Sequence, residues 1–150
     1  ILAFLLGASY IVLANTLTTP SHVNQDFATI QTPNGSLIFA EIADTPNKRS
    51  RGLKERTQLA PEQGMLFTYQ ETGYWTFWMK NTKISLDMIW INPKGIIVDI
   101  EHNAPICKRN DNLCPRYHPN NPAIAVLELL AGQAKKLKLR TGNELIITLP

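Results

Sequence analysis

Hydrophobic residues in this chain occur in short runs separated by turn-forming residues, a pattern typical of β-strands. Residues 27–32 and 37–42 are two such runs, and they flank Pro33-Asn34-Gly35-Ser36. Because Asn-Gly is a strong signal for a tight turn, these two runs are predicted to form a β-hairpin. The same pattern predicts further strands at residues 64–69, 74–80, 86–91, 96–101, 123–129 and 144–149.

Helical signals are limited to two short segments. Thr45 can cap a basic helix that begins at Pro46, and Gly52 within it marks either close packing or a break. Residues 131–139 form the second predicted helix, which ends near Gly142. The expected fold is therefore mainly β, a β-rich α+β domain built as a compact antiparallel sheet or barrel-like structure with two short helices. Successive strands from residue 64 onward are expected to pair as an antiparallel meander.

The N-terminal segment differs from the rest of the chain. Residues 1–14 are almost wholly apolar, and the first charged residue is Asp26. An apolar run of this length is shorter than the roughly 20 residues of a membrane-spanning helix and suits a secretion signal. Because the chain opens on Ile1, we expect its true start further upstream, which leaves a longer anchor open. Residues 1–25 are thus predicted to be a signal peptide or N-terminal membrane anchor plus linker, and residues 26–150 a single globular domain.

Composition agrees with one exported domain. The chain has 150 residues, 44% of them hydrophobic, and a formal net charge of +3. A basic cluster at residues 135–140 alternates lysine and arginine with leucine and lacks aromatic residues, so it indicates a solvated helix face and no nucleic-acid partner is expected. We expect a periplasmic or extracellular location, with the membrane reached only through the N-terminal segment.

Residues 75–91 contain all three tryptophans together with polar residues that need partners if they are buried. With the polar end of the strand at 96–101, this block supplies the candidate ligand-binding residues Trp78, Lys80, Asn81, Asp87, His102 and Asn103. Each also has a purely structural interpretation: Asp87 accepts hydrogen bonds from loop amides or pairs with Lys80, and Asn81 forms a turn. Both interpretations stay open at this stage.

Cys107 and Cys114, the only two cysteines, lie in a polar segment without secondary-structure signals at residues 103–122. In an oxidising compartment they are expected to form a disulfide. The alternative is a metal site that adds His102 and His118, but the cysteine spacing is unlike that of ordinary zinc sites, so no metal or cofactor is predicted. A long ordered loop of this kind could act as a lid.

Several motifs occur in a fixed order along the chain. They are Arg49-Ser50-Arg51-Gly52-Leu53, Gly64-Met65-Leu66-Phe67, Phe77-Trp78-Met79-Lys80-Asn81-Thr82, Leu86-Asp87-Met88-Ile89, His102-Asn103-Ala104-Pro105, Val126-Leu127-Glu128, Ala131-Gly132 and Gly142. In this order, across residues 36–149, the chain resembles the domain of unknown function 192 family. It departs from the family pattern at Ser85, Lys54 and Leu130, where the family commonly has proline, methionine and proline, which bears on local turns and packing. The resemblance implies a small, mostly β fold and frequent export, and it implies no activity.

Three classes of function fit these observations. The first is an exported module that binds a small ligand or glycan through the aromatic and polar residues named above. The second is a small hydrolase or isomerase that uses Asp87 or Glu101 as base and His102 as acid, although no catalytic motif supports it. The third is an envelope structural domain or protein-interaction domain whose basic helices contact an envelope partner.

Overall fold

The structure is a computed structural model that describes residues 27–109 and 112–150. The predicted signal or anchor at residues 1–25 lies outside the described residues. The strands are β1 (Phe27–Gln31), β2 (Leu37–Ala43), β3 (Gln63–Gly73), β4 (Phe77–Trp78), β5 (Leu86–Ile91), β6 (Ile97–Ala104), β7 (Arg116–Tyr117), β8 (Ala123–Leu130) and β9 (Ile146–Thr148), and the helices are α1 (Pro46–Arg51) and α2 (Gln133–Lys136). The expected class, mainly β with two short helices, is confirmed.

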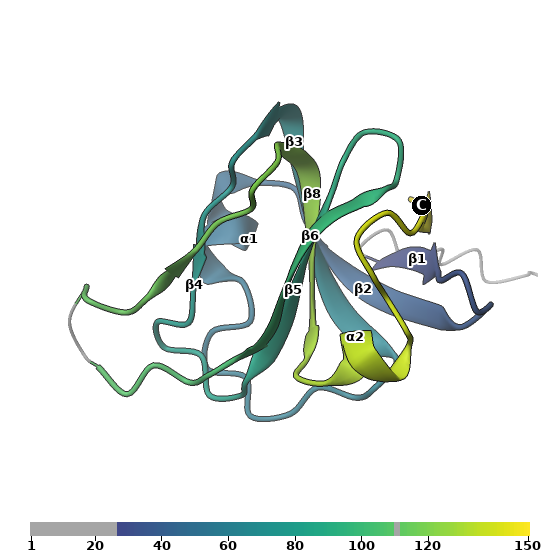
Figure 1. The fold of residues 1–150 in the computed structure, drawn as a ribbon. Helices are drawn as coiled ribbons and strands as arrows, with labels where there is room; N and C mark the ends of the chain where they lie inside the picture. Colours follow the sequence, from purple (N-terminus) through teal and green to yellow (C-terminus); the bar gives the residue numbers. More distant parts are fainter. Residues whose placement is uncertain (1–26, 110–111) are drawn as a thin grey trace, which may run out of the picture.

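Seven strands form one sheet in the order β6-β5-β8-β3-β2-β1-β9, and β4 pairs with β7 in a separate two-stranded sheet (Figure 1). The expected meander is wrong, because β8 lies between β3 and β5 and pairs with both. The sheet is also mixed, since β2 and β3 run parallel. Parallel neighbours need a crossover connection, and the chain through α1 supplies it. The large sheet is curved but does not close into a barrel.

The predicted hairpin of β1 and β2 is confirmed. Its strands pair from Phe27↔Glu41 to Gln31↔Leu37, and the turn contains Gly35 with a φ of 84°. The Asn34 Oδ1 accepts the N–H of Ser36 at 3.1 Å, which fixes the turn locally. Local turn chemistry is therefore sufficient to place this first pair of strands.

The strand predicted at residues 74–80 is shortened to Phe77–Trp78. The reason lies in Trp75, whose ring stacks on Tyr69 with centroids 3.7 Å apart and whose Nε1 donates to the Ala123 carbonyl at 2.9 Å. The Trp75 carbonyl in turn accepts from Trp90 Nε1 at 2.9 Å. These long-range contacts tie the segment to the sheet through side chains instead of a strand ladder.

The C-terminal elements are shorter than predicted. α2 spans four residues within the predicted helix at 131–139, and Lys138 has a φ of 58°, which an α-helix cannot accommodate. The last strand is Ile146–Thr148 within the predicted 144–149. Neither helix of the described residues is long and apolar enough to cross a membrane.

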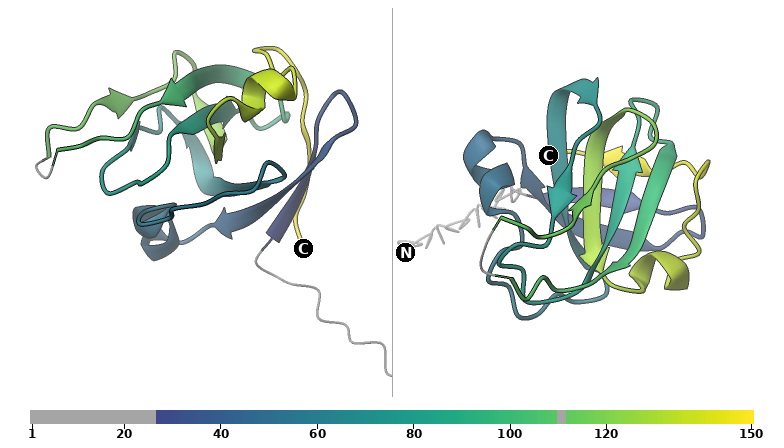
Figure 2. Two further views of the ribbon diagram at one scale, coloured as in Figure 1. Left: turned by 90° about the horizontal axis from the view of Figure 1, so that it is seen from below. Right: turned by 60° about the vertical axis from the view of Figure 1, so that its left-hand side comes forward.

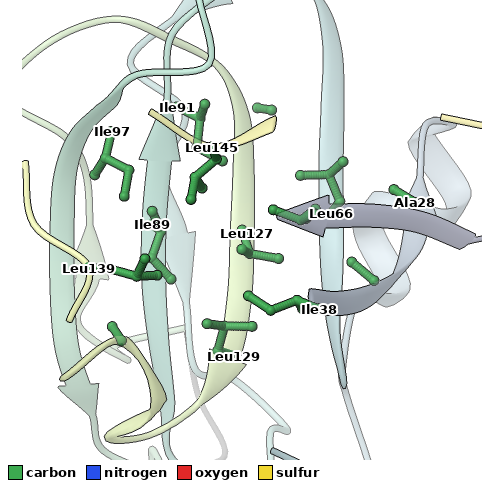
Figure 3. Close-up of a cluster of buried hydrophobic side chains, with 14 residues drawn as sticks. Ala28, Ile38, Leu66, Ile89, Ile91, Ile97, Leu127, Leu129, Leu139 and Leu145 are labelled. Carbon is green, nitrogen blue, oxygen red and sulfur yellow. The ribbon is translucent and has the colours of Figure 1, made fainter. Parts of the chain in front are cut away.

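Both faces of the large sheet are covered. On one face, Ile89, Leu127 and Leu129 pack with Ala134 of α2 and with Leu145, and Figure 3 shows most of this core. On the other face, the residues that pack together come from β3, β5 and β8, the chain after α1, and β4. Figure 1 shows α1 and β4 on the side of the sheet opposite to α2. The candidate site below lies on the side of α1 and β4.

Cys107 and Cys114 form a disulfide with a Cα–Cα distance of 5.8 Å, as predicted, so neither thiol remains for the alternative metal site. The bridge closes a loop immediately before β7. Because β7 pairs with β4 through Phe77↔Tyr117 and Trp78↔Arg116, the two strands form an arm that stands out from the large sheet (Figures 1 and 2). The disulfide thus links the two ends of the loop that leads into β7.

Candidate functional site

The structure separates the six predicted site residues into two groups. Trp78 and Lys80 lie in and just after β4 and line a pocket on the α1 side of the sheet. Asp87 and Asn103 meet at the junction of β5 and β6, where the contact uses the Asn103 backbone. His102 is exposed near the end of β6. Asn81 is exposed after β4 with a φ of 59°, and its carbonyl accepts the N–H of Glu55 at 2.9 Å.

Asp87 is fully buried and has a structural role. Its Oδ1 accepts the N–H of Asn103 at 2.8 Å, and its Oδ2 accepts the N–H of Ala134 at 2.8 Å. Backbone amides thus bind Asp87, as the structural interpretation expects, although the two amides belong to β6 and α2 and not to loops. Lys80 does not pair with Asp87; its Nζ instead donates to the Asn112 Oδ1. With both carboxylate oxygens engaged by the backbone, Asp87 holds the end of β6 and the start of α2 together.

The pocket is a cavity of about 170 Å³ on the α1 side of the sheet. Its wall comes from α1 and the turn after it, from β3, from β4 and its flanks, and from β8. Most lining residues are aromatic, cationic or hydroxyl-bearing: Arg49, Ser50, Arg51, Lys54, Phe67, Tyr69, Thr76, Phe77, Trp78, Lys80 and Thr82, with Gly52, Leu53 and Glu128 completing the set.

Glu128 is the acidic residue of this pocket. It lies on the central strand β8, opposite Met65 of β3 and Met88 of β5, and is 4% exposed. Among the described residues, no side chain or amide forms a hydrogen bond or ion pair with its carboxyl group. Burial raises the pKa of the Glu128 carboxyl to about 8. At neutral pH this group is therefore mostly neutral and can donate a hydrogen bond into the pocket.

Tyr69 is the second titratable group of the pocket. It follows Phe67 on β3 by two residues, so both side chains share a face of the sheet. Burial raises the pKa of Tyr69 to about 12; the nearby Glu128 adds to this shift and Arg49 opposes it. The Arg49 guanidinium lies 4.9 Å from the ring centroid, and its Nη1 donates to the carbonyls of Asp44 and Thr68 at 2.7 and 2.9 Å. Tyr69 thus stays a neutral hydroxyl donor over a wide pH range.

Gly52 brings α1 close to the sheet. Thr45 caps the helix by accepting the N–H of Lys48 at 3.2 Å, and the Gly52 N–H donates to the Lys48 carbonyl at 2.8 Å as the helix ends. Gly52 has a φ of 51° and a ψ of −141°, and a Cβ there would lie 3.3 Å from Cζ of Phe67. Glycine is thus required both by the backbone conformation and by the packing of this wall of the pocket.

Trp78 forms part of the opposite wall. Its ring lies under two cations, with Arg116 Cζ 4.4 Å and Lys80 Nζ 5.2 Å from the ring centroid. Arg116 comes from β7, so the disulfide-bridged arm helps to hold the indole in place. The cations compete with a sugar for stacking on the indole, so Trp78 acts here chiefly as a rigid wall.

Comparison with known proteins identifies the family. The family model described as DUF192, "Uncharacterized ACR, COG1430", matches residues 29–147. The chain belongs to this family. The expected resemblance is thereby confirmed.

Solved structures support the same fold for this DUF192 domain. A Sinorhizobium meliloti 1021 protein, described as a candidate transcription regulator, is 35% identical over 81% of this chain and 92% of its own, with a TM-score of 0.70. A protein of unknown function from Novosphingobium aromaticivorans DSM 12444 is 30% identical over 80% of this chain and 83% of its own, with a TM-score of 0.71. No curated protein matches the chain.

The motifs that carry the DUF192 resemblance meet at two places. The motifs at residues 49–53, 64–67, 77–82 and 126–128 all contribute to the pocket or to the packing beneath it. The motifs at residues 86–89, 102–105 and 131–132 instead meet around Asp87 and the two amides that it accepts. Of the residues predicted from the sequence, Trp78 and Lys80 belong to the pocket, whereas Asp87 and Asn103 belong to the second place.

Sequence reasoning did not select Glu128 or Tyr69. A signal for Glu128 is present, because it is the one charged residue in the otherwise apolar run at residues 123–130. A carboxyl residue within an apolar strand, with no positively charged residue near it in the sequence, is a candidate functional residue. For Tyr69 the sequence holds no comparable signal, since the residue becomes part of the site only through the pairing of β3 with β8.

Proposed function

We propose that this domain binds a small ligand in the pocket between α1, β3, β4 and β8. The observation that supports the proposal most directly is Glu128, a carboxyl group that is 4% exposed, borders the cavity and has no hydrogen-bond partner among the described residues. Among the described residues, every buried side-chain polar atom has a hydrogen-bond partner, so the unpaired carboxyl oxygens of Glu128 are reached from the cavity that it lines. A carboxyl group on a mostly buried residue that opens only to a cavity favours a partner from outside the chain.

The volume of the pocket limits the size of the ligand. A cavity of about 170 Å³ holds roughly five or six waters at their liquid volume of about 30 Å³ each. It is smaller than the typical drug-sized pocket of about 300–1,000 Å³. The ligand is therefore a single ring or a short polar molecule, and a longer glycan would place only one unit inside.

We place this binding function in an exported protein. The Cys107–Cys114 disulfide supports that part of the proposal, because disulfides persist mainly in oxidising compartments. The bridge also lies beside the arm that carries Arg116 against Trp78, so the oxidised state supports the wall of the pocket.

A screen of small polar molecules by ligand-observed NMR tests the proposal. Thr76 is exposed and lines the pocket, whereas Thr72 is exposed on β3 and does not line it. Compounds that bind the natural protein should lose binding in Thr76→Trp, which adds a large ring to the lining of the pocket, and keep it in Thr72→Trp. Hits that bind equally well to Thr76→Trp would contradict binding at this pocket.

Acid–base catalysis in the same pocket is the second candidate. The raised pKa of Glu128, about 8, suits a general acid that is protonated at neutral pH, and Tyr69 supplies a second proton donor beside it. Under this candidate, Glu128→Gln would still bind the ligand found in the screen but would no longer convert it. If the ligand is recovered unchanged after prolonged incubation with the natural protein, catalysis is contradicted and binding remains the proposed function.

A further inference from the structure

The pocket has a strong excess of positive charge. Among the described residues, four cationic side chains line it and none of the four forms an ion pair with a carboxylate: Arg49, Arg51, Lys54 and Lys80. Three of them bind neutral groups: Arg49 Nη1 donates to the Asp44 and Thr68 carbonyls, Lys54 Nζ donates to the Ser50 carbonyl at 2.6 Å, and Lys80 Nζ donates to Asn112. Lys48 and, less strongly, Arg49 lower the pKa of the Asp44 carboxyl group, so the net positive charge of the cavity comes mainly from Arg51, Lys54 and Lys80.

The acidic residues near this region pair with other cations, which do not line the cavity. The pairs are Lys48 with Asp44 at 3.2 Å, Arg56 with Glu41 at 2.6 Å and Lys83 with Glu55 at 3.4 Å. None of these three carboxylates lines the pocket. The arrangement leaves an electropositive cavity for which a ligand would be the counter-charge.

Glu128 is consistent with an anionic ligand only in its neutral form. A protonated carboxyl group donates a strong, charge-assisted hydrogen bond to an oxyanion, whereas an ionised one would repel it. Burial keeps the pKa of Glu128 near 8, so the donor form predominates at neutral pH. The Tyr69 hydroxyl adds another donor that stays protonated.

From this charge distribution we infer that the pocket binds a small oxyanion, a carboxylate or phosphate on a body no larger than one sugar ring, with neutral Glu128 donating a hydrogen bond to it. The inference rests on the proposed function, because it names the chemical class of the ligand for the same pocket. Arg51, Lys54 and Lys80 supply the attraction, and the aromatic walls exclude larger bodies.

The charged and titratable groups around Glu128 determine how binding depends on pH. Tyr69 faces it from β3, and the cations face it from α1, the turn after α1 and the end of β4. On the β5 side, Met88 separates Glu128 from Glu101 of β6, which pairs directly with Met88. Of these groups, Glu128 is the one whose charge changes near pH 8. Binding should weaken as Glu128 ionises.

Three sugars that differ only at one carbon test the inference: glucose, glucuronate and glucose 6-phosphate. Binding is followed through the amide signals of Gly52 and Thr82 in NMR titrations of the whole chain. At pH 6.5 at least one of the two anions should bind about tenfold more tightly than glucose, and added salt should reduce that difference. Which anion binds better distinguishes a carboxylate from a phosphate ligand.

Matched variants test which lysines attract the anion. Lys54→Met and Lys80→Met should each weaken binding of the preferred anion about threefold or more, whereas Lys94→Met, in an exposed turn away from the pocket, should not. The affinity of the natural protein should fall between pH 6.5 and 9. In Glu128→Gln, whose amide is a donor at every pH, the affinity should stay constant over that range.

The outcomes separate the inference from the proposed function. If glucose binds as tightly as both anions, the pocket binds a small ligand but its preference for oxyanions is refuted. If none of the three sugars shifts the pocket signals, both the inference and binding of a ring in this pocket are refuted. If the anions bind but Lys54→Met, Lys80→Met and Lys94→Met behave alike, the anion lies elsewhere and the inference is wrong.

Discussion

The Asp87 carboxylate and the Ala134 amide are 2.8 Å apart, and through this contact the side chain of a central strand holds the first turn of α2. The second oxygen of the carboxylate accepts the N–H of Asn103 in the same way. Asp87 therefore satisfies two backbone donors, a buried one at Ala134 and a partly buried one at Asn103.

Removal of the Asp87 carboxylate should destabilise the domain strongly. Asp87→Ala leaves two amides without an acceptor, and we expect the free energy of unfolding to fall by about 3–5 kcal/mol in urea denaturation. Asp44→Ala removes an exposed carboxylate paired with Lys48 and is expected to cost less than about 1 kcal/mol. Equal losses in the two variants would contradict the structural role of Asp87.

Substitution of Gly52 should cost more than substitution of another glycine with positive φ. In Gly52→Ala the new Cβ meets the Phe67 ring at 3.3 Å, whereas in Gly35→Ala it meets nothing within 4 Å. We expect a loss of about 2–4 kcal/mol for Gly52→Ala and about 1 kcal/mol for Gly35→Ala. Urea denaturation of the two variants measures the difference, and the lower midpoint of Gly52→Ala would reflect the close packing of α1 against the sheet. Identical midpoints would show that this packing does not constrain residue 52.

Reduction of the disulfide should lower stability by a modest amount. The Cys107–Cys114 bridge closes a short loop, so the expected loss is about 2–3 kcal/mol. Thermal denaturation with and without a reductant measures it, and the double variant Cys107→Ser with Cys114→Ser should melt at one temperature in both conditions. A reductant that leaves the melting temperature of the natural protein unchanged would count against a stabilising bridge.

Stability should also depend on pH through Glu128. Its pKa is raised from an ordinary value of 4.5 to about 8 in the folded protein. Below pH 4.5 the carboxyl is neutral in both the folded and the unfolded chain; between 4.5 and 8 the unfolded chain alone loses the proton. The contribution of Glu128 to stability is therefore full at low pH, falls by at most about 1.4 kcal/mol per pH unit through this window and levels off above pH 8.

Comparison with Glu128→Gln isolates this contribution. The stability of the variant minus that of the natural protein should increase steadily from pH 5 to pH 8 in urea denaturation, because glutamine does not ionise. A difference that stays constant over this range would mean that Glu128 is already ionised in the folded protein at pH 5.

Features that depend on contacts between neighbouring residues could be predicted from the sequence, whereas features that depend on distant contacts could not. Asn34 and Gly35 determine a turn through contacts within the turn itself, so the hairpin was predictable. The cysteine pair was predictable because so few pairings exist. Trp75 shows the limit: its ring and its carbonyl bind partners 6 to 48 residues away, and these contacts interrupt a strand that the local pattern predicts.

The candidate site was predictable only in part, for a related reason. Trp78 and Lys80 were selected from their own motif, and they do line the pocket. Asp87 belongs to the same stretch of sequence, but its strand neighbours are set by the insertion of β8 beside β5, which no local pattern indicates. The same insertion places Glu128 beside Tyr69 and α1, and thereby creates the pocket from residues far apart in the sequence.

The central position of β8 has a consequence for the order in which the protein can fold. β3 and β5 each pair with β8, so neither can complete its hydrogen bonds before residue 130 has been synthesised. Until then a growing chain presents β5 and the apolar first half of β3 with open edges, which are prone to aggregate. The two halves of the large sheet, β1 to β3 and β5 with β6, can therefore be joined only after almost the whole domain has been synthesised, and a chaperone that shields the open edges of β3 and β5 during that interval would raise the yield of folded protein.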